Sequence, residues 1–269
     1  MDWNEAQQRL AEPMFAPLRA ALARLPRDRW PTHEELSAAA EGLETASGRG
    51  LRFVPPPKPG AGERRSYEER IAATGEVPTR ERDWHDLFNA LAWLAYPRTK
   101  ARINAQHAAI LAEGGEEEAL RRGPERDALT LFDEGGVIVA SSSAQLLRLA
   151  ADREWKQLFW HRRAEHAASL AFFAFGHALF EKGLAPYPGI AAKTVFVRVD
   201  ELFFVLPGEA QVARIDEAAS GHFANRMRFA SPRAMPPLPV LGIPGWHPDT
   251  ARESWYDDER HFQGLAPGS

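Results

Sequence analysis

The amino-acid sequence predicts an α+β fold: a mostly helical single domain with a small antiparallel sheet that contains a β-hairpin. Apolar residues recur at helical spacing through most of the chain, whereas residues 194–199 alternate in the way that strands do. Residues 129–140 hold two apolar runs separated by Glu134, Gly135 and Gly136. Because glycine readily takes the positive φ that hairpin turns need, these two runs are interpreted as the hairpin strands, 129–133 and 137–140.

The N-terminal elements have clear local signals. Residues 5–25 show helical spacing of apolar groups, which Pro13 and Pro17 break or kink because proline lacks a backbone N–H. Thr32 and Glu35 have the spacing of a capping box, in which each side chain bonds the backbone of the other residue. A second helix is therefore expected to begin after Thr32.

Three short patterns predict the next elements. Residues 51–54 form a brief apolar run of the kind found in strands, and residues 67–74 form a helix that a following glycine ends. Residues 84–96 and 98–113 each have helical periodicity. Pro97 lies between them, and it suits the first turn of the second helix, so a bend is expected there.

The C-terminal half is also mostly helical in this interpretation. Residues 143–149, 154–161 and 209–223 have helical spacing, and residues 162–182 form the longest such pattern. That segment has small side chains, mostly alanine, on one side and bulky side chains on the other. This pattern predicts a central buried helix packed closely by its neighbours.

The bulk composition indicates a single globular domain over residues 1–269. Hydrophobic residues make up 44% of the chain and charged residues 26%, so the chain can bury a sizeable core and is not disordered as a whole. A proline- and glycine-rich stretch at about 55–65 is interpreted as an internal surface loop, because the preceding segment is too short to build its own core. Residues 231–269, also rich in proline and glycine, are expected to be irregular.

Charge and cysteine content exclude several classes of function. The net charge of −4 and the pI near 6.2 disfavour binding to nucleic acid or to an anionic membrane. The chain has no cysteine, which removes disulfides, thiolate zinc sites and a cysteine nucleophile. The N-terminus lacks the features of a signal peptide, and the most apolar run is too short to span a bilayer. A soluble cytoplasmic protein is therefore expected.

One helix carries more polar groups than packing requires. On residues 84–96, His85 and Asn89 are one turn apart on one stripe, with Asp86 about 100° around the helix from His85. This arrangement predicts a catalytic group in which His85 acts as general base and Asp86 or Asn89 orients it. The alternative is that His85 and Asp86 cap the helix and bond neighbouring loops.

Basic residues flank this helix, and they predict the charge of the ligand. Arg80 precedes the helix and Arg98 follows it, so both are candidates to hold an anionic small molecule near a helix N-terminus. The alternative is a solvated basic face that balances nearby acidic residues. The sequence does not specify a metal or a cofactor.

The remaining histidines and the common motifs add little. His107 faces the predicted core of its helix and is interpreted as structural, while His177 and Glu181 are one turn apart and form a possible pair. His161 and His166 lie about 140° apart on a continuous helix, which does not suit a shared metal. The HExxH, G-x-S-x-G, P-loop and G-x-G-x-x-G motifs are absent, which disfavours the enzyme classes that carry them.

Five sequence blocks carry a resemblance to a known family. They read WHDLFNALAWLAYPRTKARINAQH, RDALTLFDEGGVIVAS, GHALFEKGL, LPVLGIPGW and WYDD, and they extend over about residues 67–262. The chain resembles a family of uncharacterised bacterial proteins known as domain of unknown function number three thousand and twenty-five. The resemblance implies a single domain and places His85, Asp86 and Asn89 in a defining motif. It implies no activity.

Two classes of function fit these residues. The first is an enzyme, a hydrolase or another acid-base catalyst, that acts on an anionic small molecule at His85 and Asn89. The second is a non-catalytic binding or adaptor protein in which the same residues are structural. A concave pocket lined by both side chains and a basic group would favour the enzyme, whereas buried and fully bonded side chains would favour the adaptor.

Overall fold

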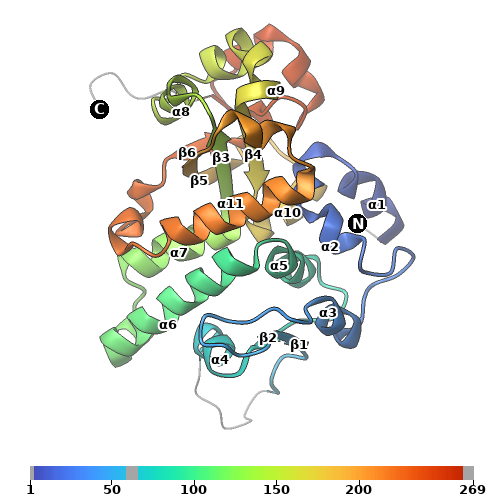
Figure 1. Cartoon of the computed structure of the whole chain (residues 1–269), viewed down its shortest axis with the longest axis vertical. Helices are drawn as coiled ribbons and strands as arrows, with labels where there is room; N and C mark the ends of the chain where they lie inside the picture. The colour runs from blue at the N-terminus through green and yellow to red at the C-terminus, as the bar shows by residue number, and fades with distance from the viewer. Residues whose placement is uncertain (1–2, 59–65, 263–269) are drawn as a thin grey trace.

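The computed structural model of the chain describes residues 3–58 and 66–262, and its fold is α+β, as predicted (Figure 1). The helices are α1 (Trp3–Leu10), α2 (Arg19–Leu22), α3 (His33–Ala39), α4 (Tyr67–Thr74), α5 (Trp84–Ala95), α6 (Pro97–Leu120), α7 (Pro124–Gly135), α8 (Ala144–Ala151), α9 (His166–Ser169), α10 (His177–Leu184) and α11 (Gly208–His222). The strands are β1 (Arg52–Val54), β2 (Glu76–Pro78), β3 (Gly136–Ser141), β4 (Leu170–Ala174), β5 (Ala191–Arg198) and β6 (Pro237–Pro239).

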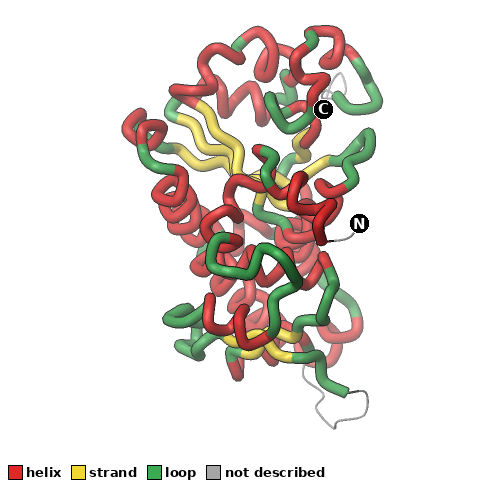
Figure 2. Tube along the Cα trace, turned by 90° about the vertical axis from the view of Figure 1, so that its right-hand side faces the viewer, coloured by secondary structure: helices red, strands yellow, loops and turns green. Residues whose placement is uncertain are grey.

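The larger sheet is mixed and buried on both faces. Its strand order is β4-β3-β5-β6, with β3 antiparallel to β4 and parallel to β5. Along β3, Val137 and Val139 belong to one hydrophobic cluster, and Ile138 and Ala140 belong to another. Because successive side chains of a strand point to opposite faces, the two clusters cover the two sides of the sheet. Figure 2 shows the strands with helices on either side.

A second, two-stranded sheet lies at the other end of the molecule with α3 and α4 (Figure 1). It pairs β1 with β2 in parallel and confirms the short strand expected at residues 51–54. The predicted capping box of Thr32 and Glu35 begins α3. Gly75 ends α4 with φ of 74°, and a side chain there would meet the backbone of Gly50.

N-terminal residues cover the outer sides of α5 and α10. Trp3 stacks on Trp84 of α5 with ring centroids 5.6 Å apart. Phe15 lies 5.9 Å from Phe88 of α5 and 5.8 Å from Phe180 of α10, measured between ring centroids. These contacts join the first turns of the chain to α5 and α10.

The predicted hairpin at residues 129–140 is wrong. Residues 129–133 belong to α7, and only residues 137–140 lie in a strand, β3, whose antiparallel partner is β4. Gly136 has φ of −83°, so it does not form a glycine turn. A Cβ at Gly136 would lie 2.5 Å from the carbonyl oxygen of Phe132, so glycine is needed where the strand leaves the helix at close range.

The single helix predicted for residues 162–182 is also wrong. This segment forms a 3₁₀ turn (Arg163–Glu165), then α9, β4 and α10. Residues 170–174 read LAFFA, and their backbone groups pair with β3 along its length. An apolar run of this kind satisfies helical and strand patterns alike, so pairing with a distant strand decided its conformation.

The predicted bend at Pro97 is confirmed. α5 ends at Ala95, Tyr96 has non-helical angles (φ −129°, ψ 54°), and α6 begins at Pro97. α6 extends beyond the predicted end at residue 113 to Leu120, with a break at Gly115 (φ 55°). No helix within residues 3–58 and 66–262 combines the length and apolar character needed to cross a membrane.

The two segments predicted to be irregular are largely so where the structure describes them. Residues 55–58 have no regular secondary structure, and residues 59–65 lie outside the described residues. Residues 231–262 contain short 3₁₀ turns and the three-residue strand β6, and residues 263–269 lie outside the described part.

Candidate functional site

A polar cavity of about 400 Å³ lies among α4, α5, α7 and the start of α10. It contains most of the residues that the sequence nominated. Its lining consists of Ser66, Tyr67, Glu68, Pro78, Arg80, His85, Asp86, Asn89, His107, Arg122, Arg126, Thr130, Asp133, Glu134 and His177. A volume of this size suits a small molecule.

The sheet register brings two of these residues together. α7 ends directly before β3, and α10 begins directly after β4. Because β3 and β4 are antiparallel, with Val137 opposite Ala174, the end of α7 meets the start of α10. Gly176 allows this close approach, since a Cβ there would lie 2.4 Å from the carbonyl oxygen of Glu134. Glu134 and His177 are therefore neighbours although they are far apart in sequence.

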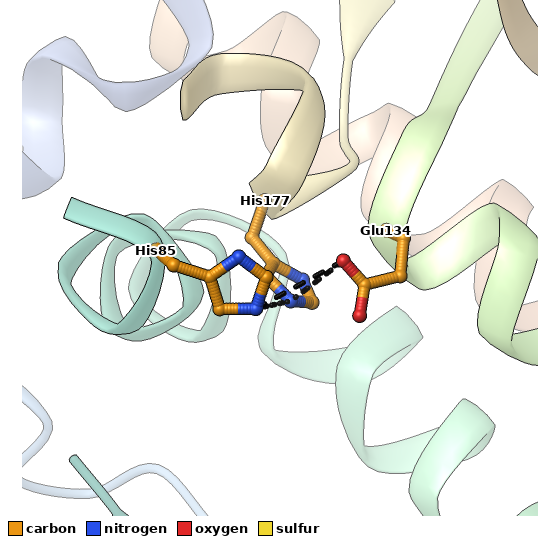
Figure 3. Close-up of side chains that lie close together, drawn as sticks. All are labelled: His85, Glu134 and His177. Carbon is orange, nitrogen blue, oxygen red and sulfur yellow. Dashed lines mark hydrogen bonds and ion pairs between the residues drawn. The ribbon is translucent and has the colours of Figure 1, made fainter. Parts of the chain in front are cut away.

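α5 adds a second histidine to this pair. Asp83 caps α5 by accepting a hydrogen bond from the backbone N–H of Asp86 at 3.0 Å, which fixes the first turn of the helix. His85 in that turn reaches His177, and the two Nε2 atoms lie 3.1 Å apart (Figure 3). Oε2 of Glu134 lies 3.4 Å from Nε2 of His177 and 3.9 Å from Nε2 of His85.

A carboxylate lies beside the Nδ1 atom of each ring. Nδ1 of His85 lies 3.1 Å from Oε2 of Glu181. Nδ1 of His177 lies 3.5 Å from Oδ2 of Asp133 and makes no hydrogen bond within the described part of the chain. A carboxylate oxygen only accepts, so Glu181 favours the tautomer of His85 that carries its proton on Nδ1. The Nε2 atom of His85 then presents a lone pair towards Nε2 of His177.

Two imidazole nitrogens and a carboxylate oxygen at such short range must share a proton or a metal ion. Burial lowers the pKa of His177 to about 3, although the charge of Asp133 opposes this, so His177 is neutral near pH 7. Burial also raises the pKa of Glu134. A neutral imidazole with its other nitrogen held by a carboxylate is the form in which histidine binds metals.

The spacing of the three ligand atoms fits one metal ion. Around zinc, with bonds of about 2.0–2.2 Å, tetrahedral ligand atoms lie roughly 3.3–3.6 Å apart. The observed separations are 3.1, 3.4 and 3.9 Å. The widest involves Glu134, whose half-exposed side chain can turn to shorten it. Among the described residues, His85, Glu134 and His177 form a group able to share an ion.

Lys100 is the buried cation of the site. Its Nζ donates to both carboxylate oxygens of Asp133, at 2.7 and 2.8 Å, and to Oδ1 of Asn89 at 2.8 Å. Burial alone would raise the pKa of Asp133, but the charge of Lys100 is the strongest opposing effect and the pKa lies below its usual value. Asp133 is thus an ionised carboxylate placed beside Nδ1 of His177.

Asn89 and Asp86 have partners other than His85. The Asn89 side chain is buried, and its Nδ2 donates to the hydroxyl of Tyr67 at 2.7 Å. Asp86 accepts from Nε and Nη2 of Arg80, at 2.9 and 2.8 Å, and from the Arg80 backbone N–H at 2.6 Å. Asn89 therefore joins α5 to α4, and Asp86 holds Arg80 at the cavity.

The structure places Arg98 outside this cavity. Its backbone N–H donates to Asp216 at 2.9 Å, and its side chain lies 3.6 Å from Glu217 of α11. It lines a different hollow between α2, β4 and α11. The basic residues that line the cavity with Arg80 are Arg122 and Arg126, from the connection between α6 and α7 and the start of α7.

Sequence comparison identifies the family. A family model described as "Protein of unknown function (DUF3025)" matches residues 51–265. The chain belongs to this family. Comparisons with curated proteins and with solved structures gave no match.

Each of the three candidate ligands lies in the region that the DUF3025 model matches. Each also falls in a different sequence block of the resemblance: His85 in WHDLF, Glu134 in FDEGG and His177 in GHALF. Sequence reasoning took Glu134 as a turn residue and paired His177 with Glu181, so it missed the group. One polar residue from each block is the signal that would have found it.

Two further histidines differ in their relation to the cavity. His107 is buried and lines the cavity, and burial lowers its pKa to about 4. Nε2 of His166 lies 2.9 Å from the carbonyl oxygen of Leu158, away from the cavity.

Proposed function

We propose that this DUF3025 protein is a metal-dependent hydrolase that acts on a small anionic ester. The observation that carries the proposal is the 3.1 Å approach of the Nε2 atoms of His85 and His177 beside Glu134. Two histidines and one carboxylate are a ligand set of catalytic zinc sites, which leave a coordination position for water or substrate. A bound metal would lower the pKa of its water to about 7 and polarise a substrate oxygen.

In this proposal His85 is a metal ligand, not the general base that the sequence suggested. Its two ring nitrogens are both committed, since Nδ1 faces Glu181 and Nε2 faces the other ligands. Glu181 and Asp133 orient the rings from behind, a role that carboxylates have in many zinc sites. Asn89 and Lys100 do not contact the metal ligands in this proposal. Lys100 holds Asp133 in place, and Asn89 holds Tyr67 of α4.

The charge of the cavity supports an anionic substrate. Its lining carries the arginines Arg80, Arg122 and Arg126 and the carboxyl groups of Glu68, Asp86, Asp133 and Glu134. A divalent cation would turn this nearly balanced set positive, so the loaded site would attract an anion. Arginine also binds phosphate and carboxylate oxygens with good geometry.

Metal titration tests the first half of the proposal. The protein is stripped with a chelator and titrated with Zn²⁺ by calorimetry. We expect one ion per chain, with affinity reduced by more than about 100-fold in His177→Ala, because even supporting residues of a metal site cost about 10–100-fold. His161→Ala is the matched control, since His161 is exposed and outside the cavity. Equal affinity in wild type and His177→Ala would refute the site.

Hydrolysis of p-nitrophenyl phosphate by the Zn²⁺-loaded protein tests the second half. We expect release of p-nitrophenol that His85→Ala and Glu134→Gln abolish and His161→Ala leaves unchanged. Zinc binding without hydrolysis of phosphate or carboxylate esters would instead favour the alternative, a non-catalytic binding protein. The buried, doubly bonded Asn89 is the feature that fits that alternative.

A further inference from the structure

Glu68 lines the cavity with a carboxyl group that is not one of the three candidate metal ligands. It lies in the first turn of α4, next to Glu69. Glu69 is engaged in the capping box, in which its carboxylate accepts from the Ser66 backbone N–H at 2.9 Å. Glu68 instead lines the cavity that His85, Glu134 and His177 also line. Of these two adjacent acids, Glu69 is therefore held by the capping box, and Glu68 is the one that lies at the cavity.

Two amide side chains fix this part of α4 on its neighbours. Nδ2 of Asn104, on α6, donates to Oε2 of Glu68 at 2.5 Å and to the Glu68 carbonyl oxygen at 3.0 Å. Nδ2 of Asn89, on α5, donates to the hydroxyl of Tyr67 at 2.7 Å. The Glu68 carboxyl is thus held in one place, which a group that transfers a proton needs.

The surroundings of Glu68 favour its protonated form. Burial raises the pKa of Glu68 to about 7, and the charge of Asp133 on α7 acts in the same direction. The amide of Asn104, the charge of Lys100 on α6 and the charge of Arg126 on α7 oppose the rise. Near neutral pH the group therefore both holds and releases a proton, the condition under which general acids work best.

We propose that Glu68 is the proton donor for the leaving group of the ester that the metal centre binds. This inference rests on the hydrolysis proposed above. The oxygen of a water molecule forms a bond to phosphorus while the ester P–O bond breaks, and the electron pair of that bond stays on the leaving oxygen. The leaving oxygen takes the proton of Glu68 and departs as an alcohol. The attacking water gives a proton to solvent, and the Glu68 carboxylate regains one from solvent, so ester and water become alcohol and phosphate.

Two substrates that differ in their leaving group test this role. Glycerol 2-phosphate releases a strongly basic alkoxide that needs a proton, whereas p-nitrophenyl phosphate releases a stable phenolate that does not. We expect Glu68→Gln to lower kcat/KM for glycerol 2-phosphate by about 10²–10⁴-fold, the usual contribution of a general acid. The same variant should change p-nitrophenyl phosphate hydrolysis by less than about 10-fold and leave Zn²⁺ affinity unchanged. Glutamine can still accept the hydrogen bond from Asn104.

Glu69→Gln is the matched control on the same helical turn. Glutamine also serves at this position of a capping box, so the helix start is kept. Neither substrate should be affected, because Glu69 does not line the cavity. A second measurement needs no variant: wild-type kcat/KM for glycerol 2-phosphate should fall as pH rises above about 7, when Glu68 loses its proton. The profile for p-nitrophenyl phosphate should lack this decline.

The outcomes separate the two proposals. If Glu68→Gln lowers both rates equally, or if both substrates have the same pH profile, Glu68 has a structural role and the proton-donor assignment is overturned. The proposed hydrolysis would then stand. If the Zn²⁺-loaded wild type hydrolyses neither ester, the proposed function fails and the assignment of Glu68 falls with it.

Discussion

Replacing Lys100 with methionine should lower the free energy of unfolding by about 3–5 kcal/mol, the cost of removing one partner from a buried ion pair. Lys100 is 4% exposed, and its Nζ makes three hydrogen bonds, two to Asp133 and one to Asn89. Methionine has a similar length and fills the space, so little of the loss comes from a cavity. The loss comes from a buried carboxylate and a buried amide oxygen left without their donor.

The size of this loss should depend on pH. In the wild type the pKa of Asp133 lies below its usual value, so its ion pair stabilises the protein above that usual value and fades as pH falls through the lower one. Without Lys100, burial dominates and the pKa of Asp133 rises above its usual value, so the variant loses stability as pH increases. The difference between the two proteins should therefore grow from pH 4 to pH 7.

Urea unfolding at several pH values measures this difference. Lys156→Met is the matched control, because Lys156 pairs with Asp257 at 2.8 Å at the surface, where an ion pair contributes about 0–1 kcal/mol. A loss below about 1 kcal/mol for Lys100→Met, or a loss that does not change with pH, would refute the role given to this ion pair.

Three further changes probe the frame around the site. Phe173→Ala should cost about 3–5 kcal/mol in urea unfolding, because the side chain is buried in the sheet against Phe203, and a cost below 1 kcal/mol would contradict this packing. Gly176→Ala should cost about 1–3 kcal/mol or more, since the new Cβ meets backbone on several sides, whereas Gly221→Ala in α11 meets nothing and should not destabilise. Burial lowers the pKa of His107 from 6.5 to about 4, so as the pH falls between those values this one group should remove roughly 1.4 kcal/mol of wild-type stability per pH unit. The unfolding midpoint of His107→Asn should have a shallower pH dependence there, and an equal slope would show that His107 titrates normally.

The helical frame could be predicted from sequence because its signals are local. The capping box at Thr32, the stop at Gly75 and the break at Pro97 each depend on neighbouring residues, and each is confirmed. The α+β class followed from the same patterns. β4 could not be predicted in this way, because the run of residues 170–174 becomes a strand only through its pairing with β3.

The residues of the candidate site could likewise be predicted where the signal was local and not where it depended on long-range pairing. His85 was nominated because its helix holds more polar groups than packing needs. Glu134 and His177 were not grouped with it, because the antiparallel register of β3 and β4 brings them together, and that register followed from an element that the sequence assigned to a helix. Arg98 was nominated from its closeness to His85 in sequence, but the bend at Pro97 directs it towards α11.

The segment before residue 51 lies outside the matched family region, yet it packs on two of the helices that carry the site. Phe15 packs on Phe88 and Phe180, and these two rings belong to the helices that hold His85 and His177. A fragment beginning at residue 51 would expose these aromatic faces to water, and each large side chain so exposed costs about 1.5–3 kcal/mol. Domains are stable by only about 5–15 kcal/mol, so a boundary drawn by sequence similarity is not a boundary for folding here. Substitutions in the first turns of the chain therefore belong among those that can alter the geometry of the two histidines.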